Sequence, residues 1–204
     1  MNTMKIIALP ALLAAAALSA QELRLGGGLN MSNVREAGHE QWTGRAGYQA
    51  GADLQLGSLW FVRGGAHLQV RNLGFSTVTL DSADAAGTLN QEYRYTDRTL
   101  RVPLLVGRNL LDASDEPVVN AYVMAGPTAL FPISARLTND EFDVRTRSAQ
   151  WLIGFGGGVT LGPLFVEATY GIAMTDVFEG ATFRTNPMVN QFCLNAGARL
   201  RLVR

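Results

Sequence analysis

Few residues of this chain have the types and the spacing that catalysis requires. The two histidines are His39, in a polar stretch, and His67, on the polar side of an alternating segment, while Ser32, Ser148 and Thr160 are scattered along the chain. A serine, a histidine and a carboxylate could form a triad for nucleophilic catalysis, but triads are recognised by geometry, and no spacing here favours one combination. We therefore interpret His67 as a hydrogen-bonded interior residue and expect no enzyme activity.

Metal, cofactor and nucleic-acid sites are equally weakly indicated. Cys193 is the single cysteine, so the sequence excludes an internal disulfide and a metal site built on several cysteines; we interpret its thiol as a small buried group. The acidic residues within 139–143 could bind a divalent cation, but the segment reads better as a solvated loop. Lys+Arg and Asp+Glu both number 17, without the basic excess of nucleic-acid-binding proteins. We expect no cofactor, no metal and no nucleic-acid partner.

The elements that must position these side chains are strands, and the clearest lie within residues 149–174. Apolar or small residues occupy every second position from Trp151 to Leu161 and again from Leu164 to Met174, and Gly162-Pro163 separates the two runs. A period of two indicates strands, because successive side chains leave a strand on opposite sides. Gly-Pro indicates a turn. Each strand has on the order of eleven residues, enough for a tilted strand to cross a bilayer.

The same alternation recurs along the chain and predicts eight strands, at 23–32, 44–56, 60–72, 98–110, 118–128, 149–161, 164–174 and 191–202. One face of each is apolar and uncharged, whereas the other is polar and rich in glycine, and Pro103 should interrupt pairing locally. Long polar segments follow the first, third, fifth and seventh strands (33–42, 73–97, 131–145 and 176–189), and short ones follow the others. This pattern predicts an all-β protein, an eight-stranded antiparallel up-and-down transmembrane β-barrel with both termini on the periplasmic, short-turn side.

The first twenty residues predict an export signal. Lys5 supplies a positive charge, Ile6 to Leu18 an apolar core, and Leu18-Ser19-Ala20 a cleavage point, so residues 1–20 are predicted to be a signal peptide and 21–204 the barrel domain. We expect localisation in the bacterial outer membrane. A soluble exported barrel or sandwich is the alternative; the long strands, the uncharged apolar faces and the glycines of the polar faces count against it, because glycine weakens a solvent-exposed strand but makes room in a narrow lumen.

Several short stretches carry a family resemblance. They are Leu100-Arg-Val-Pro-Leu-Leu-Val-Gly, Ala125-Gly-Pro, Gly154-Phe-Gly-Gly-Gly-Val, Leu164-Phe-Val-Glu-Ala-Thr-Tyr-Gly and Cys193-Leu-Asn-Ala-Gly-Ala-Arg-Leu. With these the chain resembles the small outer-membrane β-barrel domain of the PorT-like family over essentially the whole mature chain. The resemblance implies a barrel surrounded by outer-membrane lipid and placed there by the barrel-insertion machinery, and it transfers no catalytic or ligand residues. Such barrels often end on an aromatic residue, whereas this chain ends Leu202-Val203-Arg204.

Inward-facing charges suggest what fills the lumen. If Gly57-Ser58-Leu59 is a three-residue loop, Leu56 pairs with Trp60 and Asp53 faces Arg63. The periplasmic half of the lumen is then predicted to hold a structural charge cluster of Arg24, Asp53, Arg63, Glu167, Arg199 and Arg201. Eight strands leave an interior that side chains can fill, and buried charges require partners.

The functional hypothesis follows from this filled interior. We expect a small outer-membrane barrel with a plugged lumen and long extracellular loops, in a structural or interaction role, with a protein partner at the loops. The alternatives are a lipid-modifying outer-membrane enzyme and a narrow pore for small solutes.

Overall fold

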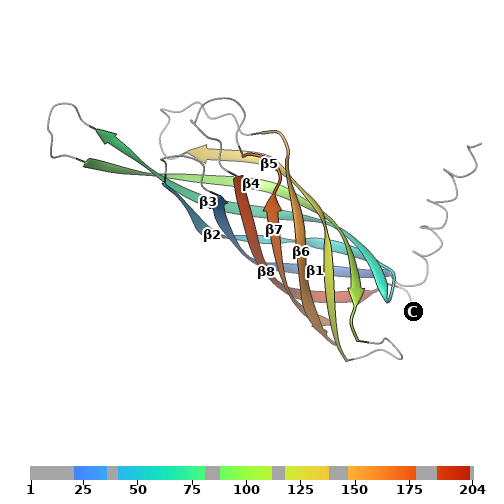
Figure 1. Cartoon of the computed structure of the whole chain (residues 1–204). Coiled ribbons are helices and arrows are strands. Elements are labelled where there is room, and N and C mark those ends of the chain that lie inside the picture. Colours follow the sequence, from blue (N-terminus) through green and yellow to red (C-terminus); the bar gives the residue numbers. More distant parts are fainter. Residues whose placement is uncertain are drawn as a thin grey trace, which may run out of the picture.

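Eight antiparallel strands form a closed barrel in the computed structural model, which describes residues 21–35, 41–80, 88–111, 118–137, 147–177 and 188–202. The strands are β1 (Gln21–Arg35), β2 (Gln41–Leu56), β3 (Trp60–Leu80), β4 (Thr88–Asn109), β5 (Val119–Leu137), β6 (Gln150–Leu161), β7 (Leu164–Ala173) and β8 (Met188–Arg201). Each strand pairs with its neighbours in sequence, and β1 closes the ring on β8 (Figure 1). The predicted fold class is confirmed; the predicted signal peptide lies outside the described residues. Among those residues, no helix is long and apolar enough to cross a membrane.

The strand registers define how steeply the barrel is sheared. A path of directly paired residues leaves Gln21 of β1, passes once around the barrel through Val62 of β3 and Phe155 of β6, and returns to β1 at Met31, ten residues further along. Eight strands with this stagger enclose an interior that side chains can fill. The inward residues of all strands are therefore close enough to contact one another.

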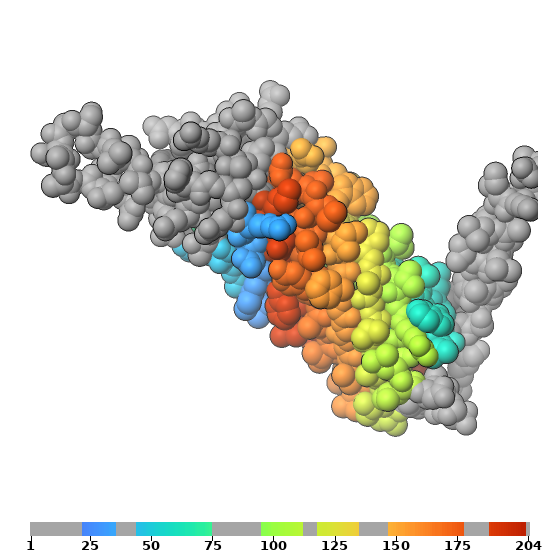
Figure 2. Space-filling view, in the orientation of Figure 1, coloured from blue at the N-terminus to red at the C-terminus, as the bar shows by residue number. Residues whose placement is uncertain are grey.

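The outer face is almost entirely apolar. Side chains such as Leu68, Leu164 and Phe155 are more than half exposed, and Figure 2 shows the outward side chains of β4 to β8 forming a continuous surface down the side of the barrel. The prediction of a charge-free face is wrong on β4, because Arg98, within the strand, and Arg108, near its short-turn end, also point outward. The Arg108 guanidinium lies 5.4 Å from the ring centroid of Trp60. Aromatic and cationic side chains are tolerated where an apolar belt meets water.

Three strands are much longer than predicted at the end opposite the termini. The segment 73–97, predicted as a long polar connection with room for a strand extension at 92–95, is mostly a ladder that continues from Leu73↔Tyr95 to Leu80↔Thr88, and β5 runs on to Leu137. In Figure 1 the β3–β4 hairpin extends beyond the other strands. Outside a bilayer a strand needs no apolar face, so the alternation fades, while β-branched residues still favour extended backbone.

The connections at the other end are short. Gly162-Pro163 forms a two-residue hairpin between Leu161 and Leu164, with Gly162 at φ 55°, as predicted. The β2–β3 prediction is wrong by two residues, because Leu56 pairs with Val62, so that Arg63 lies opposite Gln55. Gly57, at φ 103°, begins this wider turn. At Pro103 the β3–β4 ladder skips two residues of each strand without changing register.

Candidate functional site

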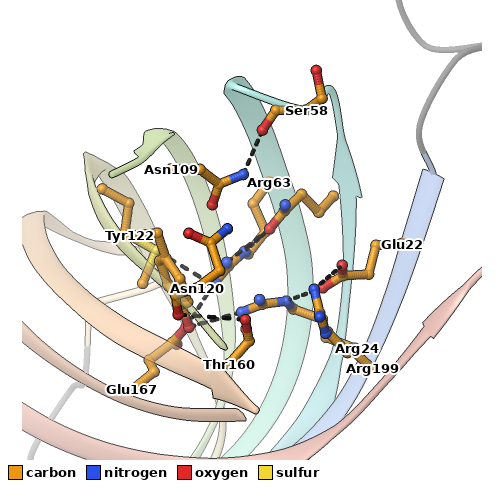
Figure 3. A network of polar contacts seen from close by, with 12 residues as sticks. Glu22, Arg24, Ser58, Arg63, Asn109, Asn120, Tyr122, Thr160, Glu167 and Arg199 are labelled. Atoms are coloured by element: carbon orange, nitrogen blue, oxygen red, sulfur yellow. Dashed lines mark hydrogen bonds and ion pairs between the residues drawn. The ribbon is translucent and has the colours of Figure 1, made fainter. Parts of the chain in front are cut away.

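Glu167 lies at the centre of a polar network inside the short-turn half of the barrel. Its Oε2 accepts hydrogen bonds from Arg63 Nη1 at 2.5 Å and from the Tyr122 hydroxyl at 2.9 Å. Arg24 Nη1 lies 3.6 Å from the same oxygen and donates to the Tyr122 hydroxyl at 2.8 Å. These four side chains come from β7, β3, β5 and β1, so their contacts cross the lumen (Figure 3).

Further partners extend this network to β8 and β2. Arg24 Nε donates to Glu22 Oε1 at 2.6 Å, and Arg199 Nη1 of β8 donates to Glu22 Oε2 at 3.1 Å. On the opposite side Arg63 donates to Gln55 Oε1 of β2 through Nη2 at 2.8 Å and Nε at 3.2 Å. The residues Glu22, Arg24, Gln55, Arg63, Tyr122, Glu167 and Arg199 are called the short-turn network below.

Aromatic rings hold the two central guanidinium groups in place. The Arg24 guanidinium carbon lies 4.7 Å from the Tyr122 ring centroid and 4.8 Å from that of Phe165, and Arg63 lies 5.0 Å from Tyr122. Such cation–π contacts stabilise desolvated cations. A Cβ at Gly158 would lie only 2.5 Å from the Tyr122 hydroxyl oxygen, so this glycine provides the room that the sequence predicted for inward glycines.

The structure brings together four of the six residues predicted to form the charge cluster. Arg24, Arg63, Glu167 and Arg199 belong to the short-turn network. Asp53 does not contact Arg63, because it lies opposite Gly65 and its Oδ1 lies 2.8 Å from His67 Nε2. Arg201 is exposed, opposite Glu22 at the end of the barrel, and is therefore not part of a buried cluster.

Sequence reasoning missed three members of the network. Glu22 precedes Arg24 by two residues and so shares its inward face, a signal that the alternation already contained. Gln55 and Tyr122 are also on polar or inward faces. Gln55 meets Arg63 because the two lie directly opposite each other in the β2–β3 ladder, whose register was predicted wrongly, whereas the contact of Tyr122 with Glu167 joins strands that are distant in sequence.

A second buried ion pair lies in the other half of the lumen. Arg71 and Asp97 are both 0% exposed. Arg71 Nε lies 3.1 Å from Asp97 Oδ1, its Nη2 donates to Asp97 Oδ2, and its Nη1 donates to Gln150 Oε1 at 3.2 Å. A buried apolar cluster lies at this end of the strands and is called the loop-side cluster: Val34, Leu73, Tyr95, Val177 and Val189. Asp97 was predicted to end a loop, so this pair was not anticipated.

The scattered catalytic candidates do not converge. His67 is buried and bonded to Asp53, which confirms the interior, hydrogen-bonded role. Ser32 is buried on β1, Ser148 is exposed, and the Thr160 hydroxyl donates to the Asn120 carbonyl at 3.4 Å. Among the described residues, neither Ser32 nor Ser148 nor Thr160 forms a hydrogen bond with His67.

The remaining candidates are a cysteine, a second histidine and an acidic segment. Cys193 is buried, as predicted. His39 and the acidic segment 139–143 lie outside the described residues. Within the described ranges no three His, Cys, Asp or Glu side chains are grouped so that they could hold a metal ion.

Comparison with known families adds to this geometry. Residues 6–199 match the model of the family described as outer membrane protein beta-barrel domain. The chain belongs to this family. It is therefore a bacterial outer-membrane protein, and the predicted localisation is confirmed.

Solved structures of other outer-membrane barrels resemble this family member. OprG from Pseudomonas aeruginosa is 10% identical, with a TM-score of 0.58 over 91% of this chain and 98% of that one. Ail of Yersinia pestis, solved in complex with the heparin analogue sucrose octasulfate, is 15% identical, with a TM-score of 0.41 over 89% and 99%. At such identities the likeness to OprG shows the fold alone. No curated protein is similar enough to count as a match.

Proposed function

We propose that this outer-membrane protein keeps its lumen closed to solutes and acts as a structural or interaction protein through its extracellular loops, without enzymatic turnover. The observation that carries the proposal is the short-turn network, in which side chains from six strands bond to one another across the interior. The narrower placement in the PorT-like family is part of the proposal.

A solute would have to displace several charged contacts to pass this network. The single residue Arg63 makes several of these contacts: it bonds to Glu167 and to Gln55, and its guanidinium carbon lies 5.2 Å from the Phe61 ring centroid. Separating buried partners leaves uncompensated charges, at a cost of about 3–5 kcal/mol for a pair. The Arg71–Asp97 pair and the loop-side cluster form a second barrier in series, so neither end of the lumen offers an easy entry.

A proteoliposome swelling assay tests the closed lumen. Vesicles containing the wild-type protein should swell in a small sugar no faster than protein-free vesicles, while vesicles with a general porin swell rapidly. Swelling by the wild type at a rate near that of the porin would contradict the proposal and favour the narrow-pore alternative.

The proposed interaction surface is the long-loop end, where β3 and β4 extend beyond their neighbours. A photo-crosslinking residue at Thr88, in this hairpin, is compared on intact cells with one at Ser58, in the short β2–β3 turn. We expect protein adducts from Thr88 and none from Ser58, because only the hairpin should face outward. Adducts from Ser58 alone, or from neither site, would contradict a loop-mediated role.

A further inference from the structure

One buried arginine in the middle of the lumen has no hydrogen-bond or ion-pair partner among the described residues. Arg101 points inward from β4, directly opposite His67 of β3, and is only 8% exposed. It makes no hydrogen bond or ion pair with any residue that the structure describes. Four other inward arginines each bond to a carboxylate: Arg24 and Arg199 to Glu22, Arg63 to Glu167, and Arg71 to Asp97.

The carboxylates that face the lumen are already engaged elsewhere. Glu22, Asp97 and Glu167 bond to those arginines, and Asp53 bonds to His67. Arg101 is thus an inward cation with no carboxylate partner among the described residues. An uncompensated buried charge is costly, because desolvation is not repaid by a partner.

Unused hydrogen-bond donors line the same section of the lumen. The Gln191 side-chain oxygen accepts from Gln69 Nε2 at 3.3 Å, which leaves Gln191 Nε2 buried without a partner among the described residues. The hydroxyls of Thr99 and Thr128 are also buried and unpartnered in that part of the chain, as are two amide acceptors, Oε1 of Gln49 and of Gln69. The strand registers place these groups beside Arg101: Gln69, which bonds to Gln191, lies opposite Thr99 of the same strand as Arg101, and Thr128 is two residues from Leu130, which lies opposite Arg101.

We propose that the middle of the lumen binds one small monovalent inorganic anion, of the size and charge of chloride, held by Arg101 together with amide and hydroxyl donors from β4, β5 and β8. A single unmatched cation calls for a single negative charge. Hydroxyl and amide groups can donate to a spherical anion from several sides. The short-turn network and the loop-side cluster close the two ends of this section, which restricts the ligand to a small ion. The anion site does not depend on the loops having a partner.

The test compares proteins refolded from urea into vesicles at equal ionic strength in chloride, bromide or the much larger anion gluconate. Refolding in each salt removes any dependence on ion entry through the closed ends. The wild type should show a thermal midpoint that rises saturably with chloride or bromide and not with gluconate. Arg101→Gln should lose this response. Arg98→Gln, which changes an outward arginine of the same strand, should keep it.

If Arg101→Gln fails to fold, chloride bound to the wild-type protein can be measured directly. Wild-type protein refolded in radioactive chloride should retain about one chloride per chain after rapid desalting into gluconate. Failure of the wild type to retain chloride, absence of a saturable wild-type response, or an equal response in Arg101→Gln would each overturn the proposal.

Discussion

Replacing Glu167 with alanine is the most informative perturbation of the short-turn network. The wild-type carboxylate accepts hydrogen bonds from Arg63 at 2.5 Å and Tyr122 at 2.9 Å and lies 3.6 Å from Arg24. Removing one partner of a buried pair costs about 3–5 kcal/mol. Arg24 keeps Glu22 and Arg63 keeps Gln55, so we expect the lower end of this range, about 3 kcal/mol.

A conservative variant separates charge from contact. Glu167→Gln keeps one oxygen acceptor in nearly the same place but removes the negative charge. A hydrogen bond to a charged group contributes about 1.5–3 kcal/mol, against about 0.5–1.5 kcal/mol between neutral groups. We therefore expect Glu167→Gln to destabilise the barrel by about 1.5 kcal/mol, roughly half the effect of alanine.

Reversible urea titration in lipid vesicles measures both free energies of unfolding. The outward tryptophans Trp60 and Trp151 report membrane insertion by fluorescence, and heat-modifiable gel mobility checks that each variant closes into a barrel. A change below about 0.5 kcal/mol for Glu167→Ala, the range of ordinary surface substitutions, would refute the view that this carboxylate holds the lumen together. Equal losses for alanine and glutamine would locate the effect in the charge alone.

Three further variants test the rest of the barrel. Ile153→Arg should cost about 2–4 kcal/mol in vesicles and Leu161→Arg, at the short-turn end of the same strand, about 0–1 kcal/mol; equal costs in the same titration would contradict the placement of β6 across the bilayer. Asp97→Asn should destabilise the barrel by about 3 kcal/mol because it leaves Arg71 buried without its carboxylate, and a neutral result would show that the loop-side pair is dispensable. Cys193, 1% exposed, should react with a thiol reagent only after unfolding in urea, and rapid labelling of the folded barrel would contradict its burial.

The strand count and the inward and outward faces were predictable because lipid imposes a strict rule. Every outward residue of β6 from Trp151 to Leu161 is apolar or glycine, so the period of two is visible without an alignment. The rule stops at the edge of the membrane. The β3–β4 hairpin beyond it keeps its backbone pairing but loses the alternation, and the sequence therefore suggested a loop where the structure has strands.

The charge cluster was predictable in composition but not in pairing. The alternation of inward and outward positions along each strand correctly predicts that Arg24, Arg63 and Glu167 point inward. Which side chains meet depends on register, and a turn two residues wider than predicted moved Asp53 from Arg63 to His67. The contact of Arg63 with Gln55 follows from the same β2–β3 register, whereas the contacts of Tyr122 with Glu167 and Arg24 required the closed ring, which brings β5 across the lumen from β7 and β1.

The positions of the interior contacts bear on ion conduction through the barrel. All seven members of the short-turn network are within the short-turn half of the lumen, and the Arg71–Asp97 pair and the loop-side cluster occupy the other half. If the lumen is closed as proposed, an ion passing through would have to break bonded contacts in both halves. Opening events, where they occur at all, should be rare and brief.

Single-channel recording of the purified wild-type protein in a planar bilayer tests the closed lumen most directly. The account predicts a quiet baseline in the wild type. In the double variant Arg63→Ala, Glu167→Ala, which removes the centre of the network, it predicts current fluctuations. A large and steady open current through the wild-type barrel would contradict it.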